Sequence, residues 1–487
     1  MFADYVYEKS GAAYSNRILL IDADGLLTST KYTESFSAHG FDIIIYKEDL
    51  SFRIESMDKV LSPDKKTAVV ARPDQYIPYD LRRRIRIFNV SLAALFPRLD
   101  TTVLREQSSI TYDLLSSAYP QSFENLTNAA DTLRFLQQNV YSRDNIQTNL
   151  HDSCRELISR AEGCVQYKEW FAIAEEKARI DVMAVEHDVN VDTSRINYLF
   201  RDYIMAQYGK LSTAMDSESP VLVSKAMEFM RDHSNRFIII VMDGMAEFDW
   251  RILSASFTDI QYHKASAFAM IPTVTSVSRQ CLLSDKYPRE LINPWGQSKE
   301  KQEFVECAKR LGFADRNISY QRGYDSDFDH SVRCGAVIIN DIDDMVHGQM
   351  QGRIGMFNDV GVMAKQKKLA EMTKRFLATG FDVYITADHG NTTRHGLGKL
   401  TGTGVEMETK SRCMLVLKDF ADKDGIKEKY GLIEFPKTYL PKEFDYLICN
   451  VGDSFDAKGD DVMSHGGISI DECVVPFIKI KAVENNG

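Results

Sequence analysis

The feature that most constrains the fold is a short apolar run, Phe237–Met242, which stops abruptly at Asp243 and Gly244. A mostly β-branched run of this length, without alternation, is typical of a strand buried on both faces of a parallel sheet. Ligands in open α/β sheets bind just beyond the carboxyl ends of the strands. Because Gly244 lets the chain turn away sharply, the run predicts an α/β fold with Asp243 at a ligand-binding edge.

A second apolar run, Ala336–Ile339, is followed by Asp343 and His347. These two residues are four positions apart, so a helix would place both side chains on one face. Taken alone, the pair could equally be a surface ion pair. It becomes a candidate pair of metal ligands because it also follows the end of an expected strand.

A third run, Val383–Thr386, leads into Asp388 and His389, and His465 precedes the last expected strand. Taken alone, Asp243 could cap a helix and His389 could be a buried histidine with satisfied hydrogen bonds. The placement of all these side chains at successive strand ends is much harder to explain by chance. We therefore expect them to meet at one edge of the sheet.

Carboxylate oxygens and imidazole nitrogens are ligands that suit zinc and manganese, and each ion takes about three or four of them. The sequence offers enough for two divalent ions, zinc as the first choice and manganese as the alternative. The expected ligands are Asp243, Asp388, His389 and the hydroxyl of Thr275 for one ion, and Asp343, His347 and His465 for the other.

Thr275 is the candidate catalytic nucleophile. It follows a proline-containing turn and stands close to Thr273, Ser276 and Ser278. A hydroxyl is a weak nucleophile at neutral pH, but a divalent cation beside it favours its deprotonated form. These hydroxyls could also serve to cap a helix, and both roles can coexist. The pattern favours a displacement reaction at phosphorus.

Other polar residues have ordinary structural explanations. Asp22 and Asp24 follow a strand and precede a glycine, which is typical of a turn. Arg279, Lys399 and Arg412 could clamp a phosphate, although an exposed position is the default expectation for each.

Three segments of the chain differ in composition and in the spacing of their apolar residues. Residues 1–105 alternate short apolar runs, such as Ile18–Ile21 and Ala68–Ala71, with polar stretches, as in a small α/β domain. In residues 106–228 glycine and proline are rare and apolar residues recur at helical spacing, which predicts a helical domain. The α/β pattern returns in residues 229–487, which we expect to form the catalytic domain.

The bulk composition is that of an ordinary globular protein, with 44% hydrophobic and 26% charged residues. The net charge of −11 argues against broad non-specific binding of duplex nucleic acid. No apolar stretch is long enough to span a membrane, and the amino terminus does not resemble a secretory signal. The eight cysteines form no CxxC pair, so we expect reduced thiols, a cytoplasmic location and no membrane partner.

Over about residues 236–480 these motifs resemble, in their order, the PglZ domain branch of the alkaline phosphatase superfamily. The spacing after the threonine is similar to that of nucleotide pyrophosphatases, which selects Thr275 rather than Thr273. The segments that carry the resemblance are Asp243-Gly244-Met245, Pro272–Thr275 with Leu282–Pro288, Asn340–His347, Thr386–Gly390, and Ser464–Gly467 with Val474–Pro476.

The resemblance implies an alkaline-phosphatase-like domain with a central, mostly parallel sheet, two zinc or manganese ions and a phosphothreonine intermediate. It also implies nucleotide or nucleic-acid phosphate esters as substrates. Because PglZ proteins are commonly components of BREX-type anti-phage defence, it further implies protein partners in a defence system. Two alternatives remain: a scaffold subunit that binds metal without turnover, and a phosphomutase that uses the same ion pair.

Overall fold

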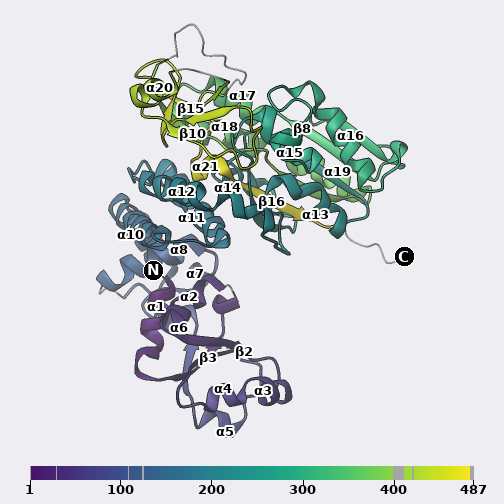
Figure 1. The fold of residues 1–487 in the computed structure, drawn as a ribbon. Helices are drawn as coiled ribbons and strands as arrows, with labels where there is room; N and C mark the ends of the chain where they lie inside the picture. The colour runs from purple at the N-terminus through teal and green to yellow at the C-terminus, as the bar shows by residue number, and fades with distance from the viewer. Residues whose placement is uncertain are drawn as a thin grey trace. The chain divides into compact units, whose positions relative to one another are not determined.

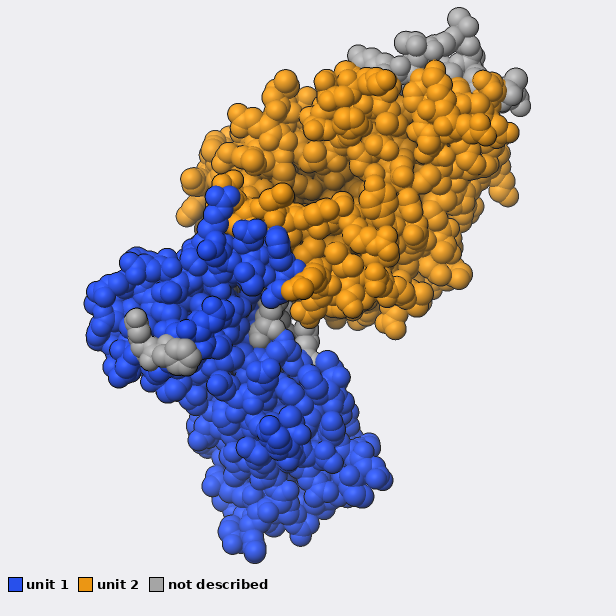
Figure 2. Space-filling model, turned by 90° about the vertical axis from the view of Figure 1, so that its left-hand side faces the viewer, with its two compact units in different colours: residues 1–153 blue, residues 154–487 orange. Residues whose placement is uncertain are grey.

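The computed structural model describes residues 2–28, 30–107, 109–122, 125–398, 411–418 and 422–482. The chain divides into two compact units, Met1–Ser153 and Cys154–Gly487, which Figure 2 shows in separate colours. The division falls inside helix α10 (Arg143–Ala161). The three segments expected from the sequence, 1–105, 106–228 and 229–487, stay predictions.

Unit 1 contains a parallel sheet of four strands in the order β2-β3-β1-β4. Figure 1 labels β2 and β3 of this sheet. The expected strands at Ile18–Ile21 and Ala68–Ala71 lie within β1 and β3, the two central strands. The strands are β1 (Arg17–Asp22), β2 (Phe41–Ile45), β3 (Lys66–Ala71) and β4 (Arg86–Val90). The helices are α1 (Phe2–Ser10), α2 (Thr30–Ala38), α3 (Asp49–Glu55), α4 (Met57–Leu61), α5 (Tyr79–Arg82), α6 (Leu92–Leu95), α7 (Thr101–Arg105), α8 (Ser109–Ala118) and α9 (Ala129–Phe135).

Unit 2 is built around a six-stranded sheet in the order β6-β16-β9-β5-β8-β7. Figure 1 labels β8 and β16 of this sheet. The neighbours of β16 run antiparallel to it, and the other pairs are parallel. This confirms the expected α/β fold with a central, mostly parallel sheet. The strands are β5 (Phe237–Met242), β6 (His263–Phe268), β7 (Ile318–Arg322), β8 (Cys334–Ile339), β9 (Asp382–Thr386) and β16 (Val474–Ile480).

Strand β5 is the centre of this sheet, and all six of its residues are completely buried. It pairs with β8 through Met242 and Ile339, and with β9 through Val241 and Thr386. Because these three parallel strands are in register, the residues that follow them reach the same edge of the sheet. The fold therefore brings together side chains that are up to about 150 residues apart in the sequence.

Helices surround this sheet, and two three-stranded sheets complete the unit. The smaller sheets are β14-β10-β15, with β10 (Thr392–Gly396), β14 (Asp453–Ser454) and β15 (Asp461–Ser464), and β11-β13-β12, with β11 (Met414–Leu417), β12 (Ile433–Glu434) and β13 (Asp445–Ile448). The helices are α11 (Tyr167–Glu186), α12 (Ser194–Gln207), α13 (Ala226–His233), α14 (Glu247–Leu253), α15 (Thr275–Ser284), α16 (Glu300–Arg310), α17 (Asp341–Gly348), α18 (Gly352–Gln366), α19 (Lys368–Ala378), α20 (Lys423–Tyr430) and α21 (Ile470–Cys473).

The helix expected before β9 is α19, which buries Leu369, Met372 and Phe376. Gly380 follows it with a left-handed φ of 81°, as expected of a residue just past a helix end. All eight cysteines are free thiols. Among the described helices, none has the length and apolar character that crossing a membrane requires.

Candidate metal centre

The first candidate ligand, Asp243, is held at the end of β5 by the backbone. Its N–H donates to the carbonyl of Ile339 at 2.8 Å, and the turn that follows needs Gly244, whose φ is 75°. A Cβ on Gly244 would lie 3.4 Å from Asp343. Glycine at position 244 is therefore required by the turn, while the distance to Asp343 is an ordinary van der Waals contact.

Asp243, Asp388 and His389 form a buried group whose ligand atoms all lie within 4.8 Å of one another. The Nε2 atom of His389 lies 3.7 Å from a carboxylate oxygen of each aspartate. Thr275 begins helix α15, and its Oγ1 lies 3.2 Å from His389 Nε2 and 3.4 Å from Asp243 Oδ1. The structure therefore brings together all four groups that the sequence assigns to one ion.

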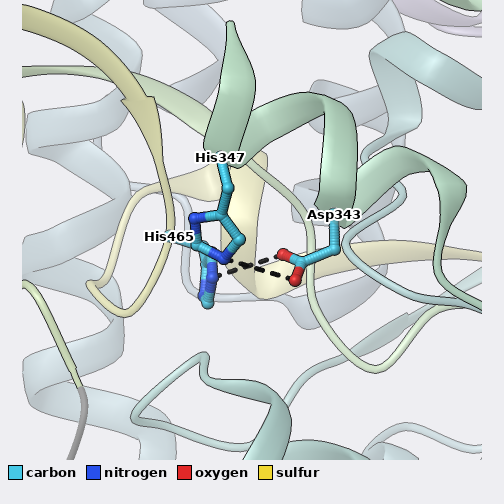
Figure 3. Close-up of side chains that lie close together, drawn as sticks. All are labelled: Asp343, His347 and His465. Carbon is cyan, nitrogen blue, oxygen red and sulfur yellow. Dashed lines mark ion pairs between the residues drawn. The ribbon is translucent and has the colours of Figure 1, made fainter.

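Asp343, His347 and His465 form the second group (Figure 3). Asp343 and His347 lie one turn apart on α17, as their spacing predicts, and His465 follows β15. The Nε2 atoms of His347 and His465 lie 3.3 and 3.4 Å from the two oxygens of Asp343. Two histidines from separate segments thus converge on one carboxylate.

The two groups are neighbours. The rings of His389 and His465 are stacked with their centroids 4.2 Å apart, and each ring belongs to a different group. Two divalent ions bound at such neighbouring sites could act together on one phosphoryl group.

Hydrogen bonds orient the rings of both stacked histidines. Nδ1 of His389 donates to the carbonyl of Gly390 at 3.0 Å, and Nδ1 of His465 donates to the carbonyl of Thr273 at 2.9 Å. Because a carbonyl can only accept, Nδ1 carries the proton, and a neutral ring keeps a free lone pair on Nε2. Burial, together with His389, lowers the pKa of His465 to about 3, so His465 is neutral at pH 7.

The surroundings of the first group disfavour negative charge on its two carboxylates. Burial raises the pKa of Asp243 well above its usual range, and the neighbouring Asp388 raises it further. Burial also raises the pKa of Asp388 to about 6. For Asp343, burial raises the pKa, but the hydrogen bond with His347 and the other histidines lower it more, so it lies below its usual range.

The donor set fits divalent cations. Asp343 Oδ1 and Asp388 Oδ2 are buried oxygens that accept no hydrogen bond in the described part of the chain, although buried polar atoms are rarely left without a partner. A cation in each group would satisfy these oxygens and relieve the repulsion between Asp243 and Asp388. Together with the imidazole nitrogens beside them, these oxygens make a donor set that matches the ligands that zinc and manganese take.

Thr273 and Thr275 have different surroundings. The hydroxyl of Thr273 accepts from the Gly466 N–H at 3.1 Å and donates to the Gly467 carbonyl at 3.0 Å. Thr273 therefore holds the loop that carries His465, whereas the hydroxyl of Thr275 faces the ligands.

Arg279 contacts the first ligand group, and the sequence did not predict this position. The default expectation of an exposed arginine is wrong, because Arg279 is 1% exposed and its guanidinium forms ion pairs with Asp243 and Glu300. It lies four residues after Thr275 on α15, and that spacing was the available signal. Arg412 forms a partly exposed ion pair with Asp456, and Lys399 lies outside the described residues.

The turn interpretation of Asp22 and Asp24 agrees with the structure. Asp22 accepts from the N–H groups of Leu26 and Leu27, and Asp24 accepts from the N–H of Leu92. These carboxylates organise backbone turns of unit 1.

A family model described as the BREX system PglZ alkaline phosphatase-like domain matches residues 221–480, more than half of the 487 residues. This chain belongs to the PglZ family. The match covers both ligand groups and Thr275, and an alkaline-phosphatase-like PglZ domain supports a phosphoester hydrolase. No curated protein matches the chain in sequence.

Similar solved structures cover about half of this PglZ chain. Murine ectonucleotide pyrophosphatase/phosphodiesterase 5 is 12% identical with a TM-score of 0.37, over 50% of this chain and 88% of its own. Phosphonoacetate hydrolase from Sinorhizobium meliloti is 10% identical with a TM-score of 0.31, over 52% of this chain and 92% of its own. Both TM-scores lie below 0.5, so the family assignment depends on the sequence match.

Proposed function

We propose that this chain hydrolyses phosphate esters of nucleotides or oligonucleotides, with Thr275 as nucleophile and two divalent ions, zinc or manganese, as cofactors. The observation that carries the proposal is the position of Thr275 Oγ1, within 3.4 Å of Asp243 and of His389, whose ring stacks on His465 of the second ligand group. Asp243, Asp388 and His389 would hold one ion, and Asp343, His347 and His465 the other.

Bound divalent ions would supply Lewis-acid stabilisation of the attacking, leaving and non-bridging oxygens. The remaining steps belong to the chain itself. Thr275 Oγ1 attacks phosphorus, the bond between phosphorus and the leaving oxygen breaks, and the proton of Thr275 ends on the leaving oxygen. Water then attacks the phosphothreonine ester: its oxygen bonds to phosphorus, the bond between phosphorus and Thr275 Oγ1 breaks, and one water proton restores the Thr275 hydroxyl.

The fold supports this role for Thr275 in two ways. Thr275 is the first residue of α15, where the partial positive charge of the helix end favours negative charge on an oxygen. Its side chain is also largely buried, so competing water has little access to the attacking oxygen.

The family description names a BREX system. We therefore propose that the chain works in cytoplasmic anti-phage defence together with protein partners of that system. A hydroxyl beside two cations can attack a phosphodiester as well as a phosphomonoester. Nucleotides and nucleic acids contain both kinds of ester, so they fit this site and this role.

The test is hydrolysis of a chromogenic phosphodiester and a chromogenic phosphomonoester by metal-free protein supplied with Zn²⁺ or Mn²⁺. We expect Thr275→Ala to reduce kcat at least about 1,000-fold, because the covalent route is lost. The matched control is Ser276→Ala, which removes the neighbouring hydroxyl and leaves Thr275 in place. Undiminished activity in Thr275→Ala would overturn the assignment of the nucleophile, and two bound ions without turnover of any ester would favour a scaffold.

A further inference from the structure

Glu472 lies on α21 and is completely buried, yet it belongs to neither ligand group. Its Oε1 accepts from the N–H of Gly467 at 2.9 Å, and at 3.3 Å it shares the hydroxyl proton of Thr273 with the Gly467 carbonyl. Its Oε2 accepts from the N–H and hydroxyl of Ser469 at 3.2 and 2.6 Å. Oε2 also accepts from the guanidinium of Arg394, so one carboxylate gathers five hydrogen bonds, which use all of its acceptor sites.

The partners of Oε1 lie in the two loops that carry functional residues of different groups. Thr273 precedes Thr275 by two residues, and Gly467 follows His465 by two residues. The two loops are also bonded to each other, because Nδ1 of His465 donates to the carbonyl of Thr273. Glu472 therefore ties the nucleophile of the first group to a ligand of the second.

The backbone of Glu472 reaches a third loop. Its carbonyl accepts from the N–H of Gly390 at 2.9 Å, directly after His389. A Cβ on Gly390 would lie 2.0 Å from the carbonyl of Asp471, so this approach requires glycine. Loops from three distant parts of the sequence thus converge on one residue.

Arg394 supplies the opposite charge. It lies on β10, it is 1% exposed, and its guanidinium forms an ion pair with Glu472. Its Nη1 also donates to the carbonyl of Asp453 at 2.7 Å. Hydrogen bonds to a charged partner are roughly twice as strong as neutral ones, so this pair can hold the Glu472 carboxylate firmly.

We propose that Glu472, with Arg394 as its counter-ion, is a positioning residue that sets the spacing between the two metal ions. The inference rests on the proposed function, since it assumes that both groups bind metal. Two ions act on one phosphoryl group when they lie about 3.5–4 Å apart. Loss of a residue that orients metal ligands typically lowers metal affinity or activity about 10- to 100-fold.

The test compares full-length, metal-free wild type with Glu472→Gln, which keeps the size of the side chain but removes its charge and one acceptor oxygen. Manganese is titrated calorimetrically, and the electron paramagnetic resonance spectrum is recorded at two equivalents. We expect two sites with exchange-coupled ions in the wild type. In Glu472→Gln we expect affinity for the second ion to fall about 10- to 100-fold, with uncoupled signals and a lower kcat at saturating metal.

The matched control is Asp471→Asn, the same amide substitution at the adjacent acid, whose side chain is 10% exposed. Asp471 faces α11 and α12, where Lys177 bonds to it at 2.8 Å and Asn197 at 3.4 Å. We expect this variant to lose thermal stability while it keeps both manganese affinities within about twofold and the coupled spectrum. A merely structural role of Glu472 would make the two variants behave alike.

A second variant, Thr273→Val, removes the hydroxyl through which the nucleophile loop contacts both Glu472 and the Gly466–Gly467 segment, and it leaves the buried ion pair in place. It keeps the proposal testable if Glu472→Gln does not fold, and we expect about a tenfold loss of the second manganese affinity. Wild-type affinities and a coupled spectrum in the variants would overturn the positioning role. Wild-type protein that binds two ions but hydrolyses no ester would refute the proposed function alone, because the metal readouts still decide the role of Glu472. Wild-type protein that binds no manganese would overturn both.

Discussion

The carboxylate of Asp388 is charged at neutral pH at an energetic cost, because burial raises its pKa from 3.8 to about 6. As the pH rises, the unfolded chain releases the carboxyl proton of Asp388 at a lower pH than the folded chain does. In the metal-free protein, Asp388 therefore lowers the free energy of unfolding between about pH 4 and pH 6, and the loss persists at higher pH.

Asp388→Asn removes this charge. We expect the metal-free variant to be more stable than metal-free wild type at pH 8, by up to about 3 kcal/mol, with little difference at pH 4. Urea unfolding of both metal-free proteins at the two pH values measures this. Added Zn²⁺ or Mn²⁺ should reverse the order, because the wild type then gains binding energy that the variant lacks. A variant that is less stable than wild type without metal would contradict this account of the site.

Arg279 stabilises the same site from the other side. Arg279→Met leaves Asp243 buried without its guanidinium partner and Glu300 with only the half-exposed Arg322 as counter-charge, so we expect the free energy of unfolding to fall by about 3–5 kcal/mol. Arg412→Met is the control, because it removes a partly exposed ion pair that is worth at most about 1 kcal/mol. Chemical denaturation of the metal-free proteins compares them, and equal losses would show that Arg279 has no special role.

At the scale of single residues, most of the candidate site could be predicted from the types of its residues and their spacing in the sequence. Each strand-end acid and histidine could be found because carboxylate and imidazole are common metal ligands and because ligand sites in open α/β sheets lie beyond the carboxyl ends of the strands. Glu472 and Arg394 could not be found in this way, since neither side chain belongs to a ligand motif. Their role depends on which distant loops pack together, and a single sequence does not encode that in a local pattern.

Among the elements, α17 is the one on which the second ligand group depends most. It has eight residues and carries both Asp343 and His347, and the N–H of Asp344 donates to the carbonyl of Asn340 at 2.9 Å. A helix this short has little stability of its own, so one lost hydrogen bond can disturb both ligands.

Asp344→Pro removes that N–H and brings the proline ring against the Asn340 carbonyl. We expect the metal content to fall from two ions to about one per chain, although no ligand is changed. Elemental analysis after dialysis measures this, and Asp344→Ala is the control that removes the same exposed carboxylate but keeps the helix. Two ions retained by the proline variant would show that the helical geometry of α17 is not required.

The predicted elements were those with a strong local pattern. Strands β5, β8, β9 and β16 have continuous apolar runs, as buried strands do. Strand β6 was not predicted, because its residues are polar and small at a sheet edge. The expected strand at Cys413–Leu417 is present as β11, but in a separate antiparallel sheet with β13. Its pairing depends on tertiary contacts, which strand propensity does not specify.

At the scale of the whole molecule, the proposed metal centre depends on segments that are distant in the sequence and meet at one edge of the sheet. Strand ends from residues 243, 339 and 386 meet because β5, β8 and β9 are parallel and in register. The loops that carry Thr275 and His465 are then held to this edge through Thr273 and Glu472. The metal centre is thus a property of the assembled sheet and its loops, not of any one segment.

The most direct test of this claim is the location of bound metal in crystals grown with Zn²⁺, measured by anomalous diffraction at the zinc edge. We predict two peaks about 3.5–4 Å apart, one among Asp243, Thr275, Asp388 and His389 and one among Asp343, His347 and His465. A single peak, or peaks outside these two groups, would contradict the account.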